Sequence, residues 1–162
     1  MRHIPRLVVE EHNQNLRKPI TPEEVDQAVQ EMPNGMAPEP DGFTLDLFKS
    51  YWDVVKQDIY DIVEDSRKYS YVLKALNSTF ITLIPKEKEA RTPDRFRPIA
   101  LCNVVYKIIS KVIENRLKPL LPIIISKEQL GFVEGRKILD NIIHAHEIIH
   151  SLKSRKKASM II

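Results

Sequence analysis

The chain contains very few of the residues that build covalent or metal-bound centres. Cys102 is the only cysteine in 162 residues, so the chain can form no intrachain disulfide and no thiolate cage for a metal ion. Four glycines stand against eleven prolines, and no Gly-x-x-x-x-Gly-Lys-Ser/Thr sequence is present, so any phosphate must be bound by side chains. No Gly-x-Ser-x-Gly sequence occurs, and Cys102 lies in an apolar run that predicts a small buried residue rather than a nucleophile.

Long hydrophobic runs are also missing. The longest apolar stretches are far too short to cross a membrane, and the N-terminal residues do not form a signal-peptide pattern. Hydrophobic residues make up 43% and charged residues 29% of the chain, which is ordinary for a soluble globular protein. The net charge of +3 permits a nucleic-acid partner without requiring one. We expect an intracellular protein of the cytoplasm or nucleus with no membrane partner.

The N-terminal half of the chain contains a polar segment followed by segments whose apolar residues have helical spacing. Residues 1–20 are interpreted as a connecting arm. The Thr-Pro-Glu-Glu sequence beginning at Thr21 is typical of a helix start with a capping box, and Thr44 predicts a second start. Apolar residues at helical spacing follow each start, so residues 21–75 are predicted to form a helical domain. Its aromatic side chains are predicted to pack in the core rather than to stack on bases.

Residues 78–101 predict a β-hairpin with cations at its tip. An apolar strand ends at Lys86, a charged loop follows, and a second strand begins near Arg95 and Arg97. Arginine presents a planar fork of donors and lysine a compact charge, and both suit a polyphosphate. The residues alone therefore indicate a polyphosphate-binding hairpin over an apolar base.

Two further helices are predicted over residues 103–118 and 138–153 from their apolar stripes. His146 and His150 are four residues apart on the second helix, but no cysteine or suitably placed carboxylate completes a zinc site there. Acidic pairs such as Asp58 with Asp61 are expected on a solvated helix face. We therefore predict no metal ligand and no catalytic residue.

Two basic features leave alternatives open. Arg136 follows a glycine before a predicted helix, where its guanidinium either contacts a nucleic-acid backbone or pairs with Asp140 at the helix start. The basic run that begins at Lys153 is either a solvated chain end or a polyanion contact.

Five short motifs occur in a fixed order along the chain. They are Ala-Pro-x-Pro-Asp-Gly-Phe at 37–43, Thr-Leu-Ile-Pro-Lys at 82–86, Phe-Arg-Pro-Ile-x-Leu-Cys-Asn at 96–103, Tyr-Lys-Ile-Ile-Ser-Lys at 106–111, and Gln-x-Gly-Phe-x-x-Gly-Arg-x-x-x-Asp-Asn-Ile at 129–142. In this order and spacing the chain, from about residue 21 to residue 162, resembles the reverse transcriptase of LINE-type (non-LTR) retrotransposons. The plant members are the most similar.

The resemblance implies an α+β, mostly helical fold. Residues 21–75 would be the N-terminal extension and residues 76–157 a fingers subdomain with a basic β-hairpin. Residues 158–162 look like the start of the first palm strand, with the rest of the palm and the thumb missing. The family's enzyme is an RNA-directed DNA polymerase that works on an RNA template, a DNA primer and a deoxynucleotide triphosphate.

The resemblance also implies roles for individual residues. Lys86 and Arg97 would bind the triphosphate of the incoming deoxynucleotide. The segment 129–141 would lie along the template strand, and its expected template-binding residues are Gln129, Phe132, Arg136 and Asn141.

Two departures from the family pattern carry expectations of their own. The family turn reads Lys-Ala-Pro-Gly-Pro-Asp-Gly, whereas this chain has Met36 and Glu39 in place of the lysine and the first glycine. Both changes are expected to weaken a phosphate contact at that turn. The expected palm strand precedes the family's first catalytic aspartate, so we expect this fragment to hold no cofactor. The two Mg²⁺ ions of the complete enzyme would have no site, and the fragment would not polymerise alone.

Two other interpretations of the sequence stay open. One is a non-catalytic helical module that binds nucleic acid or protein. The other is a decayed reading frame without a function.

Overall fold

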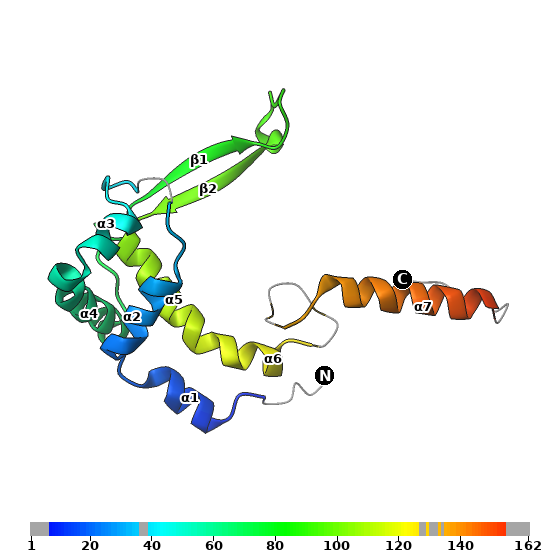
Figure 1. Ribbon diagram of the computed structural model, residues 1–162, viewed down its shortest axis with the longest axis horizontal. Helices are drawn as coiled ribbons and strands as arrows, with labels where there is room; N and C mark the ends of the chain where they lie inside the picture. Colours follow the sequence, from blue (N-terminus) through cyan, green and yellow to red (C-terminus); the bar gives the residue numbers. More distant parts are fainter. Residues whose placement is uncertain (1–6, 36–38, 127–128, 130–132, 134, 155–162) are drawn as a thin grey trace. The chain divides into compact units, whose positions relative to one another are not determined.

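The computed structural model describes residues 7–35, 39–126, 129, 133 and 135–154 (Figure 1). Residues 17–116 form one compact unit, here called the core unit, and residues 1–16 with 117–162 form a second. The elements in chain order are α1 (Glu10–Arg17), α2 (Pro22–Glu31), α3 (Leu45–Ser50), α4 (Trp52–Tyr69), β1 (Thr79–Pro85), η1 (Pro93–Arg95), β2 (Phe96–Cys102), α5 (Val104–Leu117), η2 (Lys118–Leu120), α6 (Leu121–Ile124) and α7 (Ile138–Ser154).

The fold class agrees with the sequence-based prediction. The described residues are mostly helical, and they contain one two-stranded antiparallel sheet. The segment 1–20, interpreted as a connecting arm, contains the helix α1, which buries none of its residues. Among the helices that the structure describes, none is long and apolar enough to cross a membrane.

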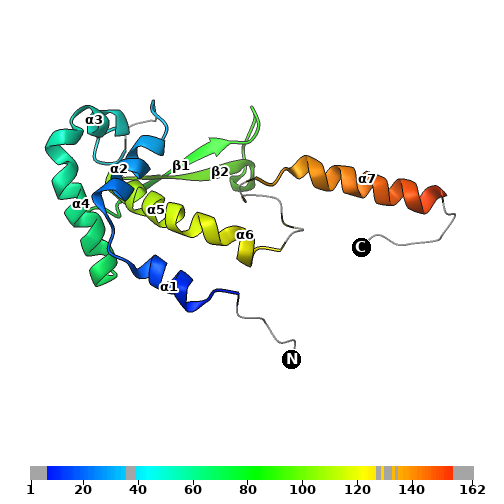
Figure 2. The same ribbon diagram turned by 60° about the horizontal axis from the view of Figure 1, so that its bottom comes forward.

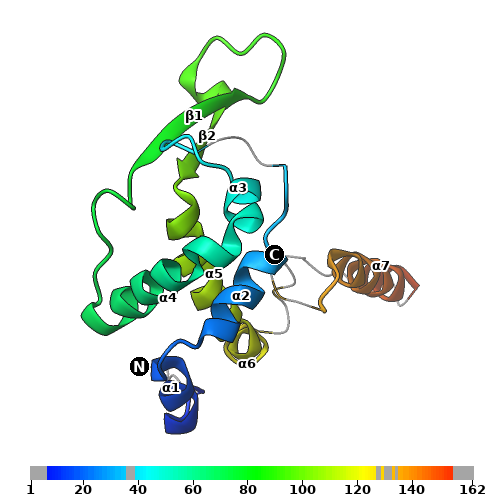
Figure 3. The ribbon, with the colours of Figure 1, turned by 60° about the vertical axis from the view of Figure 1, so that its left-hand side comes forward.

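The core unit is organised around α5, which α2 and α4 cover (Figures 2 and 3). Val25, Ala28 and Val29 fall on one face of α2 because they are spaced three and four residues apart, and all three are buried. The core cluster consists of Val25, Ala28, Val29, Met32, Leu45, Ile59, Val63, Val104, Val105, Ile108, Ile109 and Val112. The helix assigned from sequence to the fingers therefore packs in one core with the helices assigned to the N-terminal extension.

The predicted helix starts are confirmed at atomic level. The Thr21 hydroxyl accepts from the amide of Glu24, whose carboxylate accepts from the amide of Thr21 at 2.9 Å, which completes a capping box. Thr44 caps α3 by accepting from the amide of Leu47 at 3.3 Å. These caps satisfy amide groups that have no partner inside the first helical turn.

A network of charged side chains ties the segment before α2 to α4 and α5. The Arg116 guanidinium contacts both carboxylate oxygens of Glu24 at 2.8 Å and the carbonyl oxygens of Lys18 and Pro19 at 2.7 and 2.8 Å. Glu64 pairs with Arg67 and accepts from the Ile20 amide at 2.9 Å. The Arg67 guanidinium lowers the pKa of Glu64 to about 2. Glu64 is therefore partly buried, held by Arg67 three residues further along α4 and by the amide of Ile20, 44 residues away.

The aromatic residues divide between core and surface. Trp52 Nε1 and the Tyr60 hydroxyl donate to the same oxygen of Asp26, at 2.8 and 2.6 Å, which pins α2 to α4. Burial, together with that hydrogen bond to Asp26, raises the pKa of Tyr60 to about 12. The prediction of core packing was wrong for a second group, whose members are largely exposed: Tyr51, Tyr69 and Tyr71.

Candidate polyphosphate-binding hairpin

Strands β1 and β2 pair in a register that sorts their side chains onto two faces. The pairs run from Thr79 opposite Cys102 to Pro85 opposite Phe96. Successive side chains of a strand point to opposite faces, and directly opposed residues share a face. The hairpin projects from the helices of the core unit (Figure 1), and all residues of β1 are exposed.

One face of the hairpin carries no charge. Its members are Thr79, Ile81, Leu83, Pro85, Phe96, Pro98, Ala100 and Cys102. The other face, here called the Arg97 face, begins with the apolar pair Phe80 and Leu101, continues with Thr82 and Ile99, and ends with Ile84 opposite Arg97. The predicted order of an apolar base and a basic tip therefore applies to one face only.

Lys86 lies next to Arg97 in the pairing. The Lys86 amide donates to the Arg95 carbonyl at 2.8 Å, which extends the register by one residue beyond β1. Alternation from Ile84 then puts Lys86 on the Arg97 face, diagonal to Arg97, where such neighbours are about 7–8 Å apart. The two cations named from the family motif thus come together at the tip.

The cations at the tip differ in how much of their charge is already neutralised. Arg95 contacts the carboxylates of Glu87 at 3.3 Å and Asp94 at 3.4 Å. Lys86 Nζ donates to the uncharged carbonyl of Asp94 at 2.7 Å, which leaves its other two protons for a ligand. Within the described part of the chain, the Arg97 guanidinium has no hydrogen-bond or ion-pair partner, while its backbone pairs with Ile84. Lys86 and Arg97 can therefore bind an anion without first breaking an ion pair, whereas Arg95 cannot.

The segment named for template binding is described only in part. Gln129 is exposed, Phe132 lies outside the described residues, and so does the side chain of Asn141. The Arg136 guanidinium donates to the carbonyl oxygens of Ser126, Gln129 at 2.7 Å, Ile125 at 3.2 Å and Pro122 at 3.4 Å. These carbonyls include the end of α6, so Arg136 both caps that short helix and fixes the chain that follows it.

The turn around Pro40-Asp41-Gly42 contains an acidic residue whose burial was not predicted from the sequence. The Glu39 side chain is 3% exposed and pairs with Lys107 on α5, 68 residues away. Its second oxygen, Oε2, is buried and has no hydrogen-bond partner. Gly42 takes a positive φ of 81°, a conformation that glycine adopts without steric cost. Glu39, expected to weaken a phosphate contact at this turn, is buried and paired with Lys107, and so it fastens the turn to α5.

The residues present do not suit a pair of divalent cations. Among the described residues, no group of three or more histidine, cysteine or acidic side chains is placed to hold a metal ion. The carboxylates nearest the hairpin tip, Glu87 and Asp94, are engaged by Arg95.

Comparisons with known proteins identify a family and a relative of this chain. Residues 84–162 match the family described as reverse transcriptase (RNA-dependent DNA polymerase). The chain is also 31% identical over 144 residues to the "Transposon TX1 uncharacterized 149 kDa protein" of Xenopus laevis, an alignment that covers 89% of this chain and 11% of that protein. The particular similarity to plant members stays a prediction. The chain belongs to the reverse transcriptase family, and within it to the reverse transcriptases of LINE-type (non-LTR) retrotransposons.

Proposed function

We propose that this chain supplies the nucleotide-gripping hairpin and a template-binding segment of an RNA-directed DNA polymerase. Lys86 and Arg97 bind the triphosphate of the incoming deoxynucleotide from the Arg97 face. Gln129, Phe132, Arg136 and Asn141 belong to the segment along the template strand. RNA template, DNA primer and deoxynucleotide triphosphate are the partners of the complete enzyme.

One observation carries the proposal: two cations without carboxylate partners lie at the tip of one exposed hairpin, where Arg97 pairs with Ile84 and the Lys86 amide donates to the Arg95 carbonyl. A triphosphate offers closely spaced anionic oxygens, and Arg97 can meet two of them with its planar fork while Lys86 meets another as a point charge. The exposed side chains of Phe80 and Ile84 further down this face give a base or sugar an apolar surface.

The chemical step belongs to another part of the enzyme. Phosphoryl transfer of this kind uses carboxylates that hold two divalent cations, and the Mg²⁺ ions of the family belong with those carboxylates. We therefore propose that the chain binds its ligands but does not polymerise when it is alone.

The triphosphate grip can be tested directly on the 162-residue chain. Amide chemical shifts are followed by NMR while dTTP or thymidine is added. We expect shifts around residues 84–97 with dTTP and none with the nucleoside. The double variant Lys86→Ala with Arg97→Ala should weaken dTTP binding by tenfold or more, because each charge-assisted hydrogen bond contributes about 1.5–3 kcal/mol.

The matched control is Lys88→Ala with Arg91→Ala, which removes the same charge from exposed positions of the same loop. If this control weakens dTTP binding as much as the first double variant, the ligand is attracted by diffuse charge and the assigned grip is wrong. In a complete homologous polymerase that carries this segment, the double variant Lys86→Ala with Arg97→Ala should raise the KM for the deoxynucleotide.

A further inference from the structure

We propose that the core unit carries a second binding site, one that stacks an unpaired nucleobase of single-stranded nucleic acid. It consists of Tyr69 and Tyr71 at the end of α4, with Lys68 and Lys74 beside them. This site does not include the hairpin cations, the turn at Glu39 or the segment 129–141. The site shares no residue with the triphosphate grip.

The two tyrosines are exposed although both could supply large apolar contact areas. Tyr69 is 64% and Tyr71 56% exposed, and Leu73 is 57% exposed next to them. Between the tyrosines, Ser70 has a φ of 51°, a left-handed conformation that ends α4 and turns the chain. A non-glycine residue in this conformation costs free energy, and here it places two aromatic rings on the surface.

The tyrosines border a cavity of about 230 Å³. That volume corresponds to roughly eight water molecules at about 30 Å³ each, which leaves room for a small planar ring system such as a nucleobase. Its walls are apolar except for Asp65 and Ser66 of α4. Stacking on an aromatic ring accepts any base, and a carboxylate at the wall can accept from an amino or ring N–H group of a base, such as N3–H of uracil.

The charge of this region favours a polyanionic ligand. Residues 66–80 contain three basic residues, Arg67, Lys68 and Lys74, and no acidic residue, and Asp65 just before them is the one acidic residue of the cavity wall. Arg67 is engaged by Glu64. Lys68 Nζ lies 5.1 Å from the ring centre of Tyr69, and Lys74 has no partner among the described residues. Two cations therefore remain beside the tyrosines for phosphates on either side of a stacked base.

A second cavity of the core unit makes the contrast clear. A groove of about 400 Å³ between α3 and α4 is lined by Phe43, Leu47, Phe48, Tyr51, Val54 and Val55. No polar group and no cation lines it, so nothing indicates its occupant. The cavity at the end of α4 differs from this groove in its polar wall residues, Asp65 and Ser66, and in the lysines that neighbour its tyrosines in the chain, Lys68 and Lys74.

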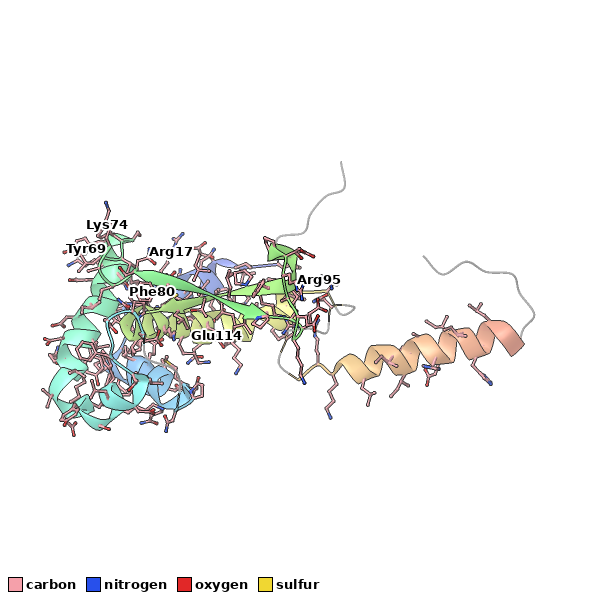
Figure 4. All side chains as sticks on the ribbon, turned by 90° about the horizontal axis from the view of Figure 1, so that it is seen from above. Arg17, Tyr69, Lys74, Phe80, Arg95 and Glu114 are labelled. Atoms are coloured by element: carbon pink, nitrogen blue, oxygen red, sulfur yellow. The ribbon has the colours of Figure 1, made fainter. Side chains whose placement is uncertain are left out.

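The site lies away from the triphosphate grip. Figure 4 shows Tyr69 and Lys74 projecting at one end of the core unit, Phe80 at the base of the hairpin, and Arg95 at its far end. The chain passes from the cavity-lining residue Leu76 to the first residue of β1, Thr79. A single strand bound at the tyrosines would therefore be held at the base of the hairpin.

The proposal is tested with the full chain and a 15-nucleotide oligo(U) RNA labelled with fluorescein, by fluorescence anisotropy. Tyr69→Ala with Tyr71→Ala should reduce affinity by at least tenfold, because stacking contributes about 1–3 kcal/mol per base. Tyr69→Phe with Tyr71→Phe keeps both rings and should bind within twofold of the unchanged chain. Lys68→Gln with Lys74→Gln should lower the slope of log affinity against log salt by about 1.4, at about 0.7 per phosphate contact.

The matched control is Tyr51→Ala, which removes another tyrosine that is 60% exposed from the uncharged groove and should leave oligo(U) affinity unchanged. Unfolding curves of the alanine variants check that the fold is intact. The proposal is overturned if the double alanine variant binds oligo(U) normally, if the phenylalanine variant loses affinity equally, or if a duplex of the same length binds as tightly. Binding of dTTP by the tyrosine variants should be unchanged, so failure here is distinct from failure of the triphosphate grip.

Discussion

The helices and the hairpin of the core unit contain similar apolar residues, but the helices bury them and the hairpin exposes them. In α5, Val104 and Ile108 are completely buried. In β1, Phe80 is 61% and Ile81 is 70% exposed, on opposite faces of a ribbon that has no covering layer among the described residues. The helices bury their apolar side chains against one another, whereas the hairpin leaves its apolar side chains exposed, where a ligand or another part of the enzyme can contact them.

The difference separates what folds this chain from what it offers to ligands. Burial of apolar area stabilises the helices by about 25 cal/mol per Å². An isolated two-stranded hairpin is only marginally stable in water, so β1 and β2 depend on their attachment to α5 and on contacts made during function. Changes in the helices should therefore act on folding, and changes in the hairpin should act on binding.

The largest effect is expected in the helical core. Ile108→Ala should lower the free energy of unfolding by about 2–5 kcal/mol, because it removes buried methyl groups and leaves a cavity. The matched control is Ile113→Ala on the same helix, where the side chain is 51% exposed, and it should cost less than about 1 kcal/mol. Urea unfolding curves measure both values. Equal costs would show that α5 is not packed as described.

An intermediate effect is expected at the pair that joins the turn to α5. Lys107→Met leaves the Glu39 carboxylate buried without its partner and should destabilise the chain by about 2–3 kcal/mol, somewhat below the cost for fully buried pairs because Lys107 is 22% exposed. Adding Glu39→Met should recover most of the loss, since two apolar side chains can replace a buried pair. A double variant no more stable than the single one would contradict the pairing.

The smallest effect on folding is expected in the hairpin. Leu83→Ala should change the free energy of unfolding by less than about 0.5 kcal/mol, as is usual for exposed positions. Leu45→Ala, the same substitution at a position 4% exposed, should cost about 2–5 kcal/mol. A large cost at Leu83 in the same urea experiment would mean that the hairpin is covered in solution and would remove the contrast between the two regions.

Local chemistry made much of the fold predictable. The starts at Thr21 and Thr44 depend on caps within three residues, and the stripes of α2 and α5 depend on regular spacing. The helix α1 was not predicted because its residues have no apolar stripe. The carbonyl of its last residue, Arg17, accepts from Arg67 at 3.0 Å, 50 positions away, and local patterns cannot report such a partner.

The candidate site was predictable in composition but not in detail. The motifs named Lys86 and Arg97, and strand alternation explains why they meet. The difference between Arg95, engaged by two carboxylates, and Arg97 depends on the path of the loop through η1. The burial of Glu39 depends on a lysine 68 residues away, and the exposure of Tyr69 and Tyr71 on a single left-handed serine. None of these has a local signature.

Trp52 gives the core unit an optical probe of its own. It is the only tryptophan in the chain, and its indole is held by Asp26 at the junction of α2 and α4. Separation of these helices would move the indole into water and shift its emission to the red, whereas motion of the hairpin would leave the emission unchanged. Ultraviolet fluorescence of the unlabelled chain therefore reports the integrity of the helices while the hairpin and the tyrosines are altered or occupied.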